Sequence, residues 1–292
     1  MSPRASIVIP AHNEESRIRP LLETLSDASL TGSYDIYVVC NGCTDRTSAV
    51  AREYPGLRVV EVADAGKYHA LNEGDRLAND VFPRLYCDAD VLISPASIDA
   101  LVDALNEPEI RAGGPTVRYG AETSSWGVKM YYRALASPIM TSWQDSHLSG
   151  RGLYGASREA RHCFDTFPPL VADDLFFDSR FSASQKMVVP SSVVTIWVPP
   201  TLRALIRSEV RVSQGNRQFY AEGRASSERD VRPPRGVRFE LKITRRLRTL
   251  HGWSRQLRWL DVATLAVLLY VKATARTAVI ARESRAKKVE WR

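Results

Sequence analysis

Short apolar runs alternate with helix-patterned segments through the first 105 residues of the chain. The apolar runs have the length of buried strands and lie at residues 5–10, 35–40, 57–62 and 81–87. The segments with apolar residues at helical spacing lie at 14–25, 46–54, 66–77 and from 94 onward. Repeated strand–helix units of this length predict an α/β fold whose sheet is mostly parallel, doubly wound and flanked by helices.

Polar segments follow three of these predicted strands, at residues 12–14, 41–45 and 88–90. In a parallel α/β sheet, ligands bind beyond the carboxyl ends of the strands. The sequence therefore predicts that these three segments meet at one edge of the sheet and form the functional site.

The segment Cys87-Asp88-Ala89-Asp90 places two carboxylates at the end of an apolar run. Two carboxylates in a crevice of low polarity repel each other and are costly to remove from water. Magnesium and manganese ions favour carboxylate oxygens and often bridge them to substrate phosphates. Asp88 and Asp90 therefore predict a divalent metal site, and the alternative is a strand-end turn with two solvated aspartates.

Gly150-Arg-Gly152-Leu-Tyr-Gly155 has the spacing of a dinucleotide-binding glycine fingerprint. It lies in the middle of the chain after a polar stretch, whereas the fingerprint closes the first strand of a nucleotide-binding sheet. This position disfavours a nicotinamide site. A flexible segment that brings the backbone close to a substrate is the better interpretation.

Together these motifs resemble family 2 of the nucleotide-sugar glycosyltransferases, which have the glycosyltransferase-A fold. The resemblance covers about residues 5–225 and depends on the order of several motifs. The matching segments are 6–15, 38–45, 66–72, 88–90, 150–155 and 172–174.

The resemblance implies a metal-dependent, inverting transfer of one sugar from a nucleoside diphosphate sugar to a hydroxyl group. It implies that Asp88 and Asp90 bind Mn²⁺ or Mg²⁺ together with the nucleotide, and that Asp174 is the general base. Asp173, which stands where relatives commonly have glutamate, is the other candidate for the base. From the residues alone, this acidic pair could instead cap a helix.

The resemblance also assigns a set of contacts to the nucleotide sugar. These residues are Pro10, Ala11, His12, Glu14, Asn41, Lys67, Asp88, Gly152, Gln214 and Arg217. Arg217 lies in a Gln-x-x-Arg element, where a planar guanidinium could neutralise diphosphate oxygens. A solvated basic helix face is the alternative for that segment.

Two departures from the family pattern bear on the substrate. Cys40 and Asn41 stand where many relatives have an aspartate that recognises uracil, so the resemblance does not carry over a uridine donor, and GDP- or dTDP-sugars stay open. Gln218 replaces the tryptophan that follows Gln-x-x-Arg in polymerising relatives, which favours transfer of a single sugar.

Positive charge is concentrated near the C-terminus. Residues 229–292 hold 17 lysines and arginines against 5 aspartates and glutamates, whereas residues 1–228 hold 23 against 28. We therefore expect a catalytic domain at 1–228 and a basic helical tail at 229–292.

The tail combines apolar residues at helical spacing over 239–260 with arginines and lysines on the other faces. Its apolar run at 262–271 is, at ten residues, too short to span a bilayer. We expect the tail to lie on an anionic membrane surface, with Trp253 and Trp259 at the interface, and to present a lipid-linked acceptor. The alternative is a helical pair packed on the catalytic domain.

The N-terminal residues lack the pattern of a signal peptide, and four cysteines are too few for a disulfide framework. We therefore expect a cytoplasmic protein, peripheral on the membrane, that acts on a lipid-linked, glycan or small-molecule acceptor. A non-catalytic nucleic-acid-binding protein built around the basic tail is the second hypothesis. Nucleic acid is not expected as a partner, because carboxylates at the strand ends would repel its backbone.

Overall fold

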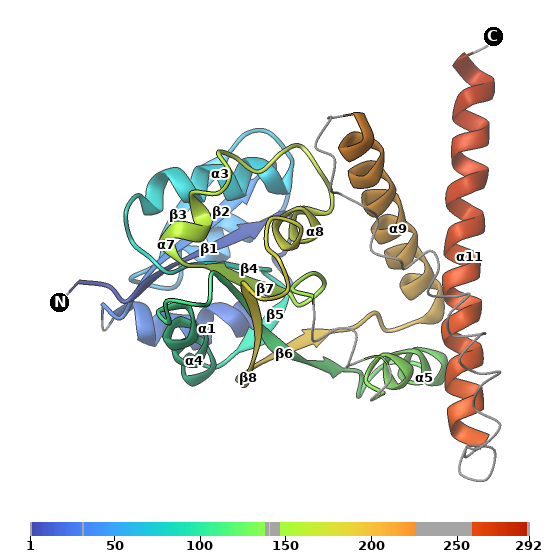
Figure 1. Ribbon diagram of the computed structural model, residues 1–292, viewed down its shortest axis with the longest axis horizontal. Helices are drawn as coiled ribbons and strands as arrows, with labels where there is room; N and C mark the ends of the chain where they lie inside the picture. Colours follow the sequence, from blue (N-terminus) through green and yellow to red (C-terminus); the bar gives the residue numbers. More distant parts are fainter. Residues whose placement is uncertain (1, 31, 138–139, 141–146, 226–258, 291–292) are drawn as a thin grey trace. The chain divides into compact units, whose positions relative to one another are not determined.

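The computed structural model describes residues 2–30, 32–137, 140, 147–225 and 259–290. The chain divides into two compact units, one of residues 1–120 and 142–197 and the other of residues 121–141 and 198–292 (Figure 1). The expected division at residue 228 is therefore displaced, because residues 198–225 belong to the same unit as the C-terminal helix.

The described part of the first unit contains an eight-stranded sheet in the order β3-β2-β1-β4-β7-β6-β8-β5. Its strands are β1 (Ala5–Ala11), β2 (Tyr34–Asn41), β3 (Arg58–Val62), β4 (Arg84–Cys87), β5 (Val91–Ile93), β6 (Ala112–Gly120), β7 (Leu153–Ala156) and β8 (Lys186–Trp197). Strands β3, β2, β1 and β4 are parallel neighbours, and β6 is parallel to β8. This confirms the predicted, mostly parallel α/β sheet. Strands β7 and β5 run antiparallel to their neighbours, which the sequence did not indicate.

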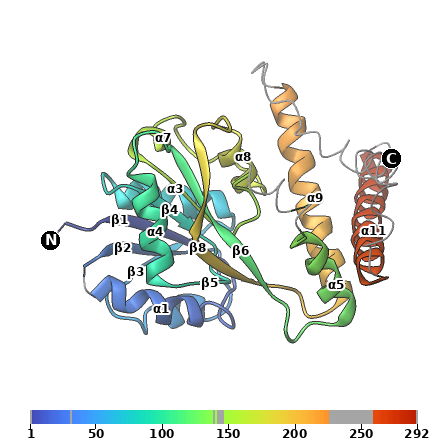
Figure 2. The same ribbon diagram turned by 60° about the horizontal axis from the view of Figure 1, so that its bottom comes forward.

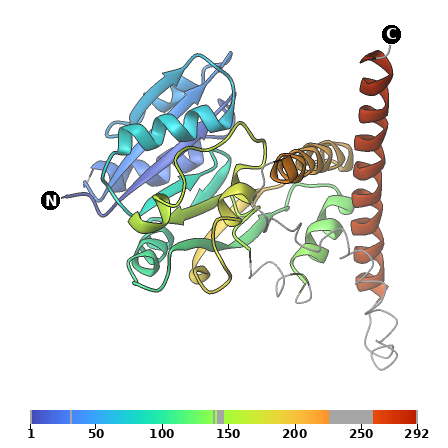
Figure 3. The same cartoon turned by 45° about the horizontal axis from the view of Figure 1, so that its top comes forward.

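Helices cover both faces of this sheet (Figures 2 and 3). They are α1 (Arg19–Leu30), α2 (Thr47–Ala51), α3 (Lys67–Ala78), α4 (Pro95–Leu105), α7 (Arg158–Arg161) and α8 (Asp173–Asp178). Ile7 and Ile9 of β1 pack in one apolar cluster with residues of α1 and α4. Val8, between them, packs in a second cluster with residues of α3 and α8. Because successive side chains of a strand point to opposite faces, β1 is buried on both sides.

Two elements begin three or more residues later than expected. The helix expected from residue 14 begins at Arg19, because residues 14–18 form a turn in which the N–H groups of Arg17 and Ile18 donate to the carbonyl of Glu14. The strand expected from residue 81 begins at Arg84, directly after Pro83, which has no N–H to donate to a neighbouring strand.

Among its described residues, the second unit contains the helices α5 (Trp126–Leu135), α9 (Leu202–Ala225) and α11 (Trp259–Glu290). Helix α11 carries a buried stripe at three- and four-residue steps, made of Thr264, Leu268, Val271, Ala275 and Val279. This stripe packs against Val128 and Tyr131 of α5 and Leu205 and Val210 of α9. Glu209 joins all three helices, because it accepts from the Tyr131 hydroxyl at 2.6 Å and pairs with the Lys272 ammonium at 2.5 Å.

Helix α11 is more apolar than the ten-residue run that the sequence suggested. Its 18-residue stretch from Thr264 to Ala281 has a mean hydropathy of 1.4 and is 28% buried. By length and composition alone, it is the one helix in the described ranges that could cross a membrane. The expected run at 262–271 stopped before Lys272, but apolar residues such as Val279 and Ile280 continue beyond that lysine. Most of the predicted amphipathic segment at 239–260, including Trp253, lies outside the described residues, and its last two residues begin α11.

Candidate active site

The carboxyl ends of β1, β2 and β4 lie at one edge of the sheet, because these three strands are parallel neighbours. Strand β7 is antiparallel to β4, so its first residue lies at the same edge. The N–H of Asp88 donates to the carbonyl of Gly152 at 2.8 Å. The fold thus gathers the segments that follow β1, β2 and β4 with the glycine segment 150–155, which runs into β7.

The turn after β1 is tied to the turn after β2. Pro10 and Ala11 are buried at the end of β1, whereas His12 is exposed. Nδ1 of His12 lies 2.6 Å from the carbonyl oxygen of Asn41, and the N–H of Glu14 donates to Oγ1 of Thr47 at 2.8 Å. These contacts fix the expected nucleotide-binding turn next to the end of β2, while its contact with a nucleotide stays a prediction.

Asn41 connects three parts of this edge. Its side chain is buried, its Nδ2 donates to the carbonyl of Ala11 at 3.0 Å, and its Oδ1 accepts from the N–H of Gly66 at 3.0 Å. Next to it, Gly42 has a φ of 53°, and a Cβ there would lie 2.7 Å from Ala65. Asn41 therefore holds the segment that starts α3, and its expected contact with the nucleotide stays a prediction.

Lys67, the first residue of α3, lies between two carboxylates. Its Nζ is 2.7 Å from Oδ1 of Asp88 and 3.0 Å from Oδ2 of Asp173, and one third of its side chain is exposed. Burial lowers the pKa of the Lys67 ammonium, but the carboxylates of Asp173, Asp88 and Asp174 outweigh it and raise that pKa overall. Lys67 therefore stays protonated and links the predicted metal motif to the predicted base pair.

Asp90, two residues beyond Asp88, is less well compensated. Its Oδ2 lies 3.7 Å from the Arg17 guanidinium, and its side chain is one third exposed. Burial, and then the charge of Asp88, raise the pKa of the Asp90 carboxyl despite the effect of Arg17. Asp88 and Asp90 together thus carry negative charge that a further cation would stabilise.

This donor set fits an ion that is completed by its substrate. No cluster of three or more histidine, cysteine or acidic side chains able to hold a metal occurs in the described ranges. Mg²⁺ and Mn²⁺ are commonly bound by one or two carboxylates together with substrate phosphates. Asp88 and Asp90 therefore fit a divalent ion of this kind.

Asp173 and Asp174 begin α8 after an N-cap at Ala172, so the interpretation of this pair as the helix N-cap is wrong. Asp173 is only 3% exposed, and its Oδ2 accepts from the Tyr154 hydroxyl at 2.7 Å as well as from Lys67. Asp174 accepts from the backbone N–H of Gly150 at 2.6 Å and from that of Leu175 at 2.8 Å. The two neighbours therefore have different chemical surroundings.

Those surroundings change how readily Asp174 ionises. Burial, and then the neighbouring charge of Asp173, raise the pKa of Asp174 to about 6. A general base is most effective when its pKa lies near the working pH. Asp174 therefore has the property expected of a base, and Asp173 has the contacts expected of a residue that positions Lys67.

Sequence reasoning missed two residues of this site. Tyr154 is buried on β7 and faces Asp173, and Arg17 approaches Asp90 from the turn before α1. Tyr154 lies inside the glycine segment, which could have drawn attention to it, whereas nothing in the local pattern marks Arg17. Gln214 and Arg217 lie on α9 in the second unit, so their predicted diphosphate contacts stay predictions.

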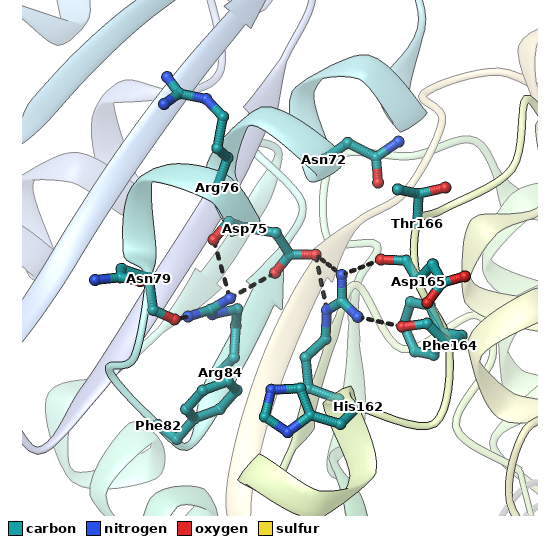
Figure 4. Close-up of a pocket in the computed structure, with 11 residues that line it drawn as sticks. Asn72, Asp75, Arg76, Asn79, Phe82, Arg84, His162, Phe164, Asp165 and Thr166 are labelled. Carbon is teal, nitrogen blue, oxygen red and sulfur yellow. Dashed lines mark hydrogen bonds and ion pairs between the residues drawn. The ribbon is translucent and has the colours of Figure 1, made fainter.

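A cleft of about 390 Å³ lies elsewhere in the first unit, toward the end of α3 that is farther from Lys67 (Figure 4). Asp75 accepts from both Arg84 and Arg161 there, at distances between 2.7 and 3.0 Å. The two guanidinium groups also donate to backbone carbonyls, among them those of Phe164 and Asp165. These charged groups join α3, β4 and α7, so a structural role accounts for them.

The chain is similar to known glycosyltransferases. The model of the family "Glycosyl transferase family 2" matches residues 6–156. A 4,4'-diaponeurosporenoate glycosyltransferase of Staphylococcus aureus is 35% identical over 111 residues, which are 34% of this chain and 27% of that protein. A dolichol-phosphate mannosyltransferase of Pyrococcus furiosus is 30% identical over 140 residues, which are 46% of this chain and 38% of that protein. The matches thus span well under half of these curated relatives.

Among solved structures, a mannosyltransferase from Pyrobaculum calidifontis in complex with GDP-Man and Mn²⁺ is similar. The TM-score is 0.59 and the identity is 22%, over 98% of this chain and 81% of that one. At this level of identity the similarity establishes the fold, which is the one expected from the sequence motifs.

Proposed function

The chain belongs to glycosyl transferase family 2, and from this membership we propose that it is a metal-dependent, inverting glycosyltransferase. It moves one sugar from a nucleoside diphosphate sugar to a hydroxyl group. The observation that carries the proposal is the position of Lys67, which joins Asp88 of the metal motif to the Asp173–Asp174 pair at one edge of the sheet. The groups needed for departure of the diphosphate and for attack by the acceptor are thereby brought together.

On the side of the leaving group, Asp88 and Asp90 are the residues that would hold Mn²⁺ or Mg²⁺. When bound, such an ion supplies a positive charge that stabilises the departing diphosphate. Asp88 orients the nucleotide from the end of β4. The carbonyl of Gly152 accepts a hydrogen bond from the N–H of Asp88, which keeps the backbone of the glycine segment close to Asp88. Mn²⁺ accompanies GDP-Man in the mannosyltransferase from Pyrobaculum calidifontis, so manganese is the first ion to test.

On the side of the acceptor, Asp174 accepts the proton of the attacking hydroxyl. The Gly150 and Leu175 N–H groups orient its carboxylate, and its raised pKa makes it a better base than a solvated aspartate. Asp173 accepts a hydrogen bond from Tyr154 and pairs with Lys67, and it acts as a residue that positions Lys67. One displacement at the anomeric carbon inverts its configuration.

The remaining donor contacts are proposed from the family pattern. Pro10, Ala11, His12, Glu14 and Asn41 form the nucleotide end of the site, because they lie at the ends of β1 and β2 and in the turn after β1 that is tied to them. Gln214 and Arg217 of α9 supply donors to the diphosphate. The nucleoside diphosphate of the donor is UDP, GDP or dTDP.

For the acceptor, we propose a lipid-linked substrate at an anionic membrane surface, reached through the C-terminal region. Helix α11 buries one stripe in its own unit and leaves Leu269, Tyr270 and Ile280 between 36% and 57% exposed. Exposed apolar residues on a helix within a basic segment are typical of binding to membrane interfaces. The relatives' names refer to diaponeurosporenoate and dolichol phosphate, so lipids are tested before glycans or small molecules.

The proposal is tested by an assay of sugar transfer. The full chain is incubated with radiolabelled UDP-, GDP- and dTDP-sugars, Mn²⁺ and a membrane lipid extract, and label in the organic phase is counted together with released nucleoside diphosphate. Asp174→Asn should reduce transfer about 10²- to 10⁴-fold, the range for loss of a general base. Asp165→Asn, in the separate cleft, is the matched control and should leave transfer unchanged. Full activity of Asp174→Asn would contradict the assignment of the base.

A further inference from the structure

Each carboxylate of the predicted metal pair already lies beside a cation of the protein itself. The Lys67 ammonium is 2.7 Å from Oδ1 of Asp88, and the Arg17 guanidinium is 3.7 Å from Oδ2 of Asp90. Lys67 also lies 3.0 Å from Asp173, whose Oδ2 accepts from Tyr154. A divalent ion that approaches Asp88 must therefore compete with an ammonium group for the same oxygen atom.

We propose that Lys67 is a positioning residue that blocks Asp88 and thereby makes divalent-metal binding depend on the nucleoside diphosphate. This inference rests on the proposed function, since it concerns the same metal motif. It assigns Lys67 a second role beside contact with the donor. The nucleotide brings negative charge that compensates both the ion and the displaced ammonium.

The geometry supplies Lys67 with a second partner. Because its Nζ contacts Asp88 and Asp173 at the same time, the ammonium can release Asp88 and keep Asp173. Asp173 is buried and fixed by the Tyr154 hydroxyl, so it offers a stationary anion to that movement. Only the lysine side chain has to shift when the metal and the nucleotide bind.

The backbone that carries Lys67 is held in place independently of this side chain. The N–H of Gly66 donates to Oδ1 of the buried Asn41 at 3.0 Å, and Gly66 has a φ of 147°. A residue with a side chain rarely adopts that conformation, so the residue before α3 has to be a glycine. The Lys67 side chain therefore extends from a fixed backbone position toward the two carboxylates.

The size of the effect follows from the charge. An adjacent unit charge changes the proton affinity of a carboxylate by about 10- to 10³-fold. A divalent ion carries twice the charge of a proton and is repelled at least as strongly by the ammonium. Removing the Lys67 charge should therefore tighten nucleotide-free Mn²⁺ binding at least about tenfold.

The test measures Mn²⁺ binding to the full chain by electron paramagnetic resonance of the free ion, with and without UDP, GDP or dTDP. For the wild-type protein, one nucleotide should tighten Mn²⁺ binding at least about tenfold. Lys67→Met should bind Mn²⁺ without nucleotide about tenfold more tightly than the wild type, whereas Lys67→Arg should not. Arg76→Met removes an exposed cation of the same helix and serves as the matched control.

The outcomes separate the inference from the proposed function. Equal Mn²⁺ affinity of the wild-type protein with and without a nucleotide that binds would overturn the inference, and this readout does not depend on how any variant folds. A folded Lys67→Met protein, checked by circular dichroism, with unchanged nucleotide-free affinity would also overturn it. If neither protein bound any of the three nucleotides with Mn²⁺, the proposed function itself would fail.

Discussion

Asp173 and Asp174 show how two identical neighbouring side chains acquire different roles. Asp173 is buried against a tyrosine hydroxyl and a lysine ammonium, whereas Asp174 is held by backbone N–H groups. Burial and the neighbouring charge of Asp173 destabilise the charged form of the Asp174 carboxyl and raise its pKa. The residue with the raised pKa is therefore the one suited to accept a proton.

The first prediction concerns the pH dependence of turnover. The value of kcat/KM should rise with pH and level off above about 6, because Asp174 must be ionised to act as a base and its pKa is about 6. The steady-state profile between pH 4.5 and 8 checks this. An acidic limb centred near pH 4 would contradict the assignment, since a solvated aspartate ionises there.

The same raised pKa has a consequence for stability. The folded protein binds the proton of Asp174 more tightly than the unfolded chain does. The stabilisation from this proton is fully present below about pH 4 and is lost as the pH rises to about 6 and above. Asp174→Asn removes the titrating group. Its free energy of unfolding should therefore fall less than that of the wild type between pH 4 and 6, as measured in urea.

The second prediction separates the two carboxylates. Asp173→Asn should move the acidic limb of kcat/KM below about 6, because the charge of Asp173 is one of the causes that raise the pKa of Asp174. The amide oxygen can still accept from Tyr154, so the local packing is kept. An unchanged limb in this variant would show that another group is the base.

At this scale the sequence could indicate the acidic pair but not choose between its members. The partners that distinguish them come from distant parts of the chain, namely Lys67 on α3 and Tyr154 on β7. No local spacing carries that information. The family pattern favoured Asp174, and the physical reason for that choice became visible only in the fold.

At the scale of elements, the site depends on how closely α3 approaches β1. A Cβ on Gly74 of α3 would lie 2.2 Å from Cγ1 of Val8, far inside any normal contact. Glycine therefore permits a distance between helix and strand that no other residue would allow. This approach fixes the helix whose first residue is Lys67.

The third prediction follows from that approach. Gly74→Ala should lower the free energy of unfolding by about 1–3 kcal/mol through overpacking, although alanine is the better helix former by about 1 kcal/mol. Gly127→Ala in α5 is the matched control, because its Cβ would meet Leu202 at an ordinary 3.7 Å. Urea denaturation followed by circular dichroism compares the two. Equal stability of both variants would contradict the packing argument.

The elements that could be predicted are those defined by local periodicity. Strands β1 to β4 and the helices between them follow from alternating apolar patterns, and each was found within a few residues of its expected place. Strand β7 between β4 and β6 could not be predicted, because it joins residues about 70 positions apart in the sequence. That strand carries Tyr154 and begins after Gly152, so part of the site depended on a non-local pairing.

At the scale of the whole molecule, the distribution of charge suggested a boundary that packing does not follow. The basic C-terminal region was expected to begin a separate part at residue 229. Helix α11 instead packs its buried stripe against α9 and α5, so the second compact unit includes residues 198–225 as well. Charge reports where a surface is basic, but apolar contacts decide which helices pack together.

The fourth prediction tests the proposed membrane surface without disturbing that packing. Replacing Leu269 and Tyr270 of α11 by serine should weaken sedimentation with anionic vesicles about tenfold or more, because each buried methylene contributes about 0.8 kcal/mol. Thr274 and Thr277, replaced by serine on the same helix, provide the control. Unchanged sedimentation of the variant with serine at 269 and 270 would contradict the proposal that this face of α11 contacts the membrane.

The central claim is that Asp88 and Asp90 bind a nucleoside diphosphate through a divalent ion. Calorimetric titration of the purified protein with UDP, GDP and dTDP, each with and without Mn²⁺, tests it most directly. We predict Mn²⁺-dependent binding of one nucleotide to the wild-type protein and its loss in Asp90→Asn. Absence of binding for all three nucleotides, in a protein shown to be folded, would contradict the account and favour a non-catalytic relative that uses its basic C-terminal region to bind nucleic acid.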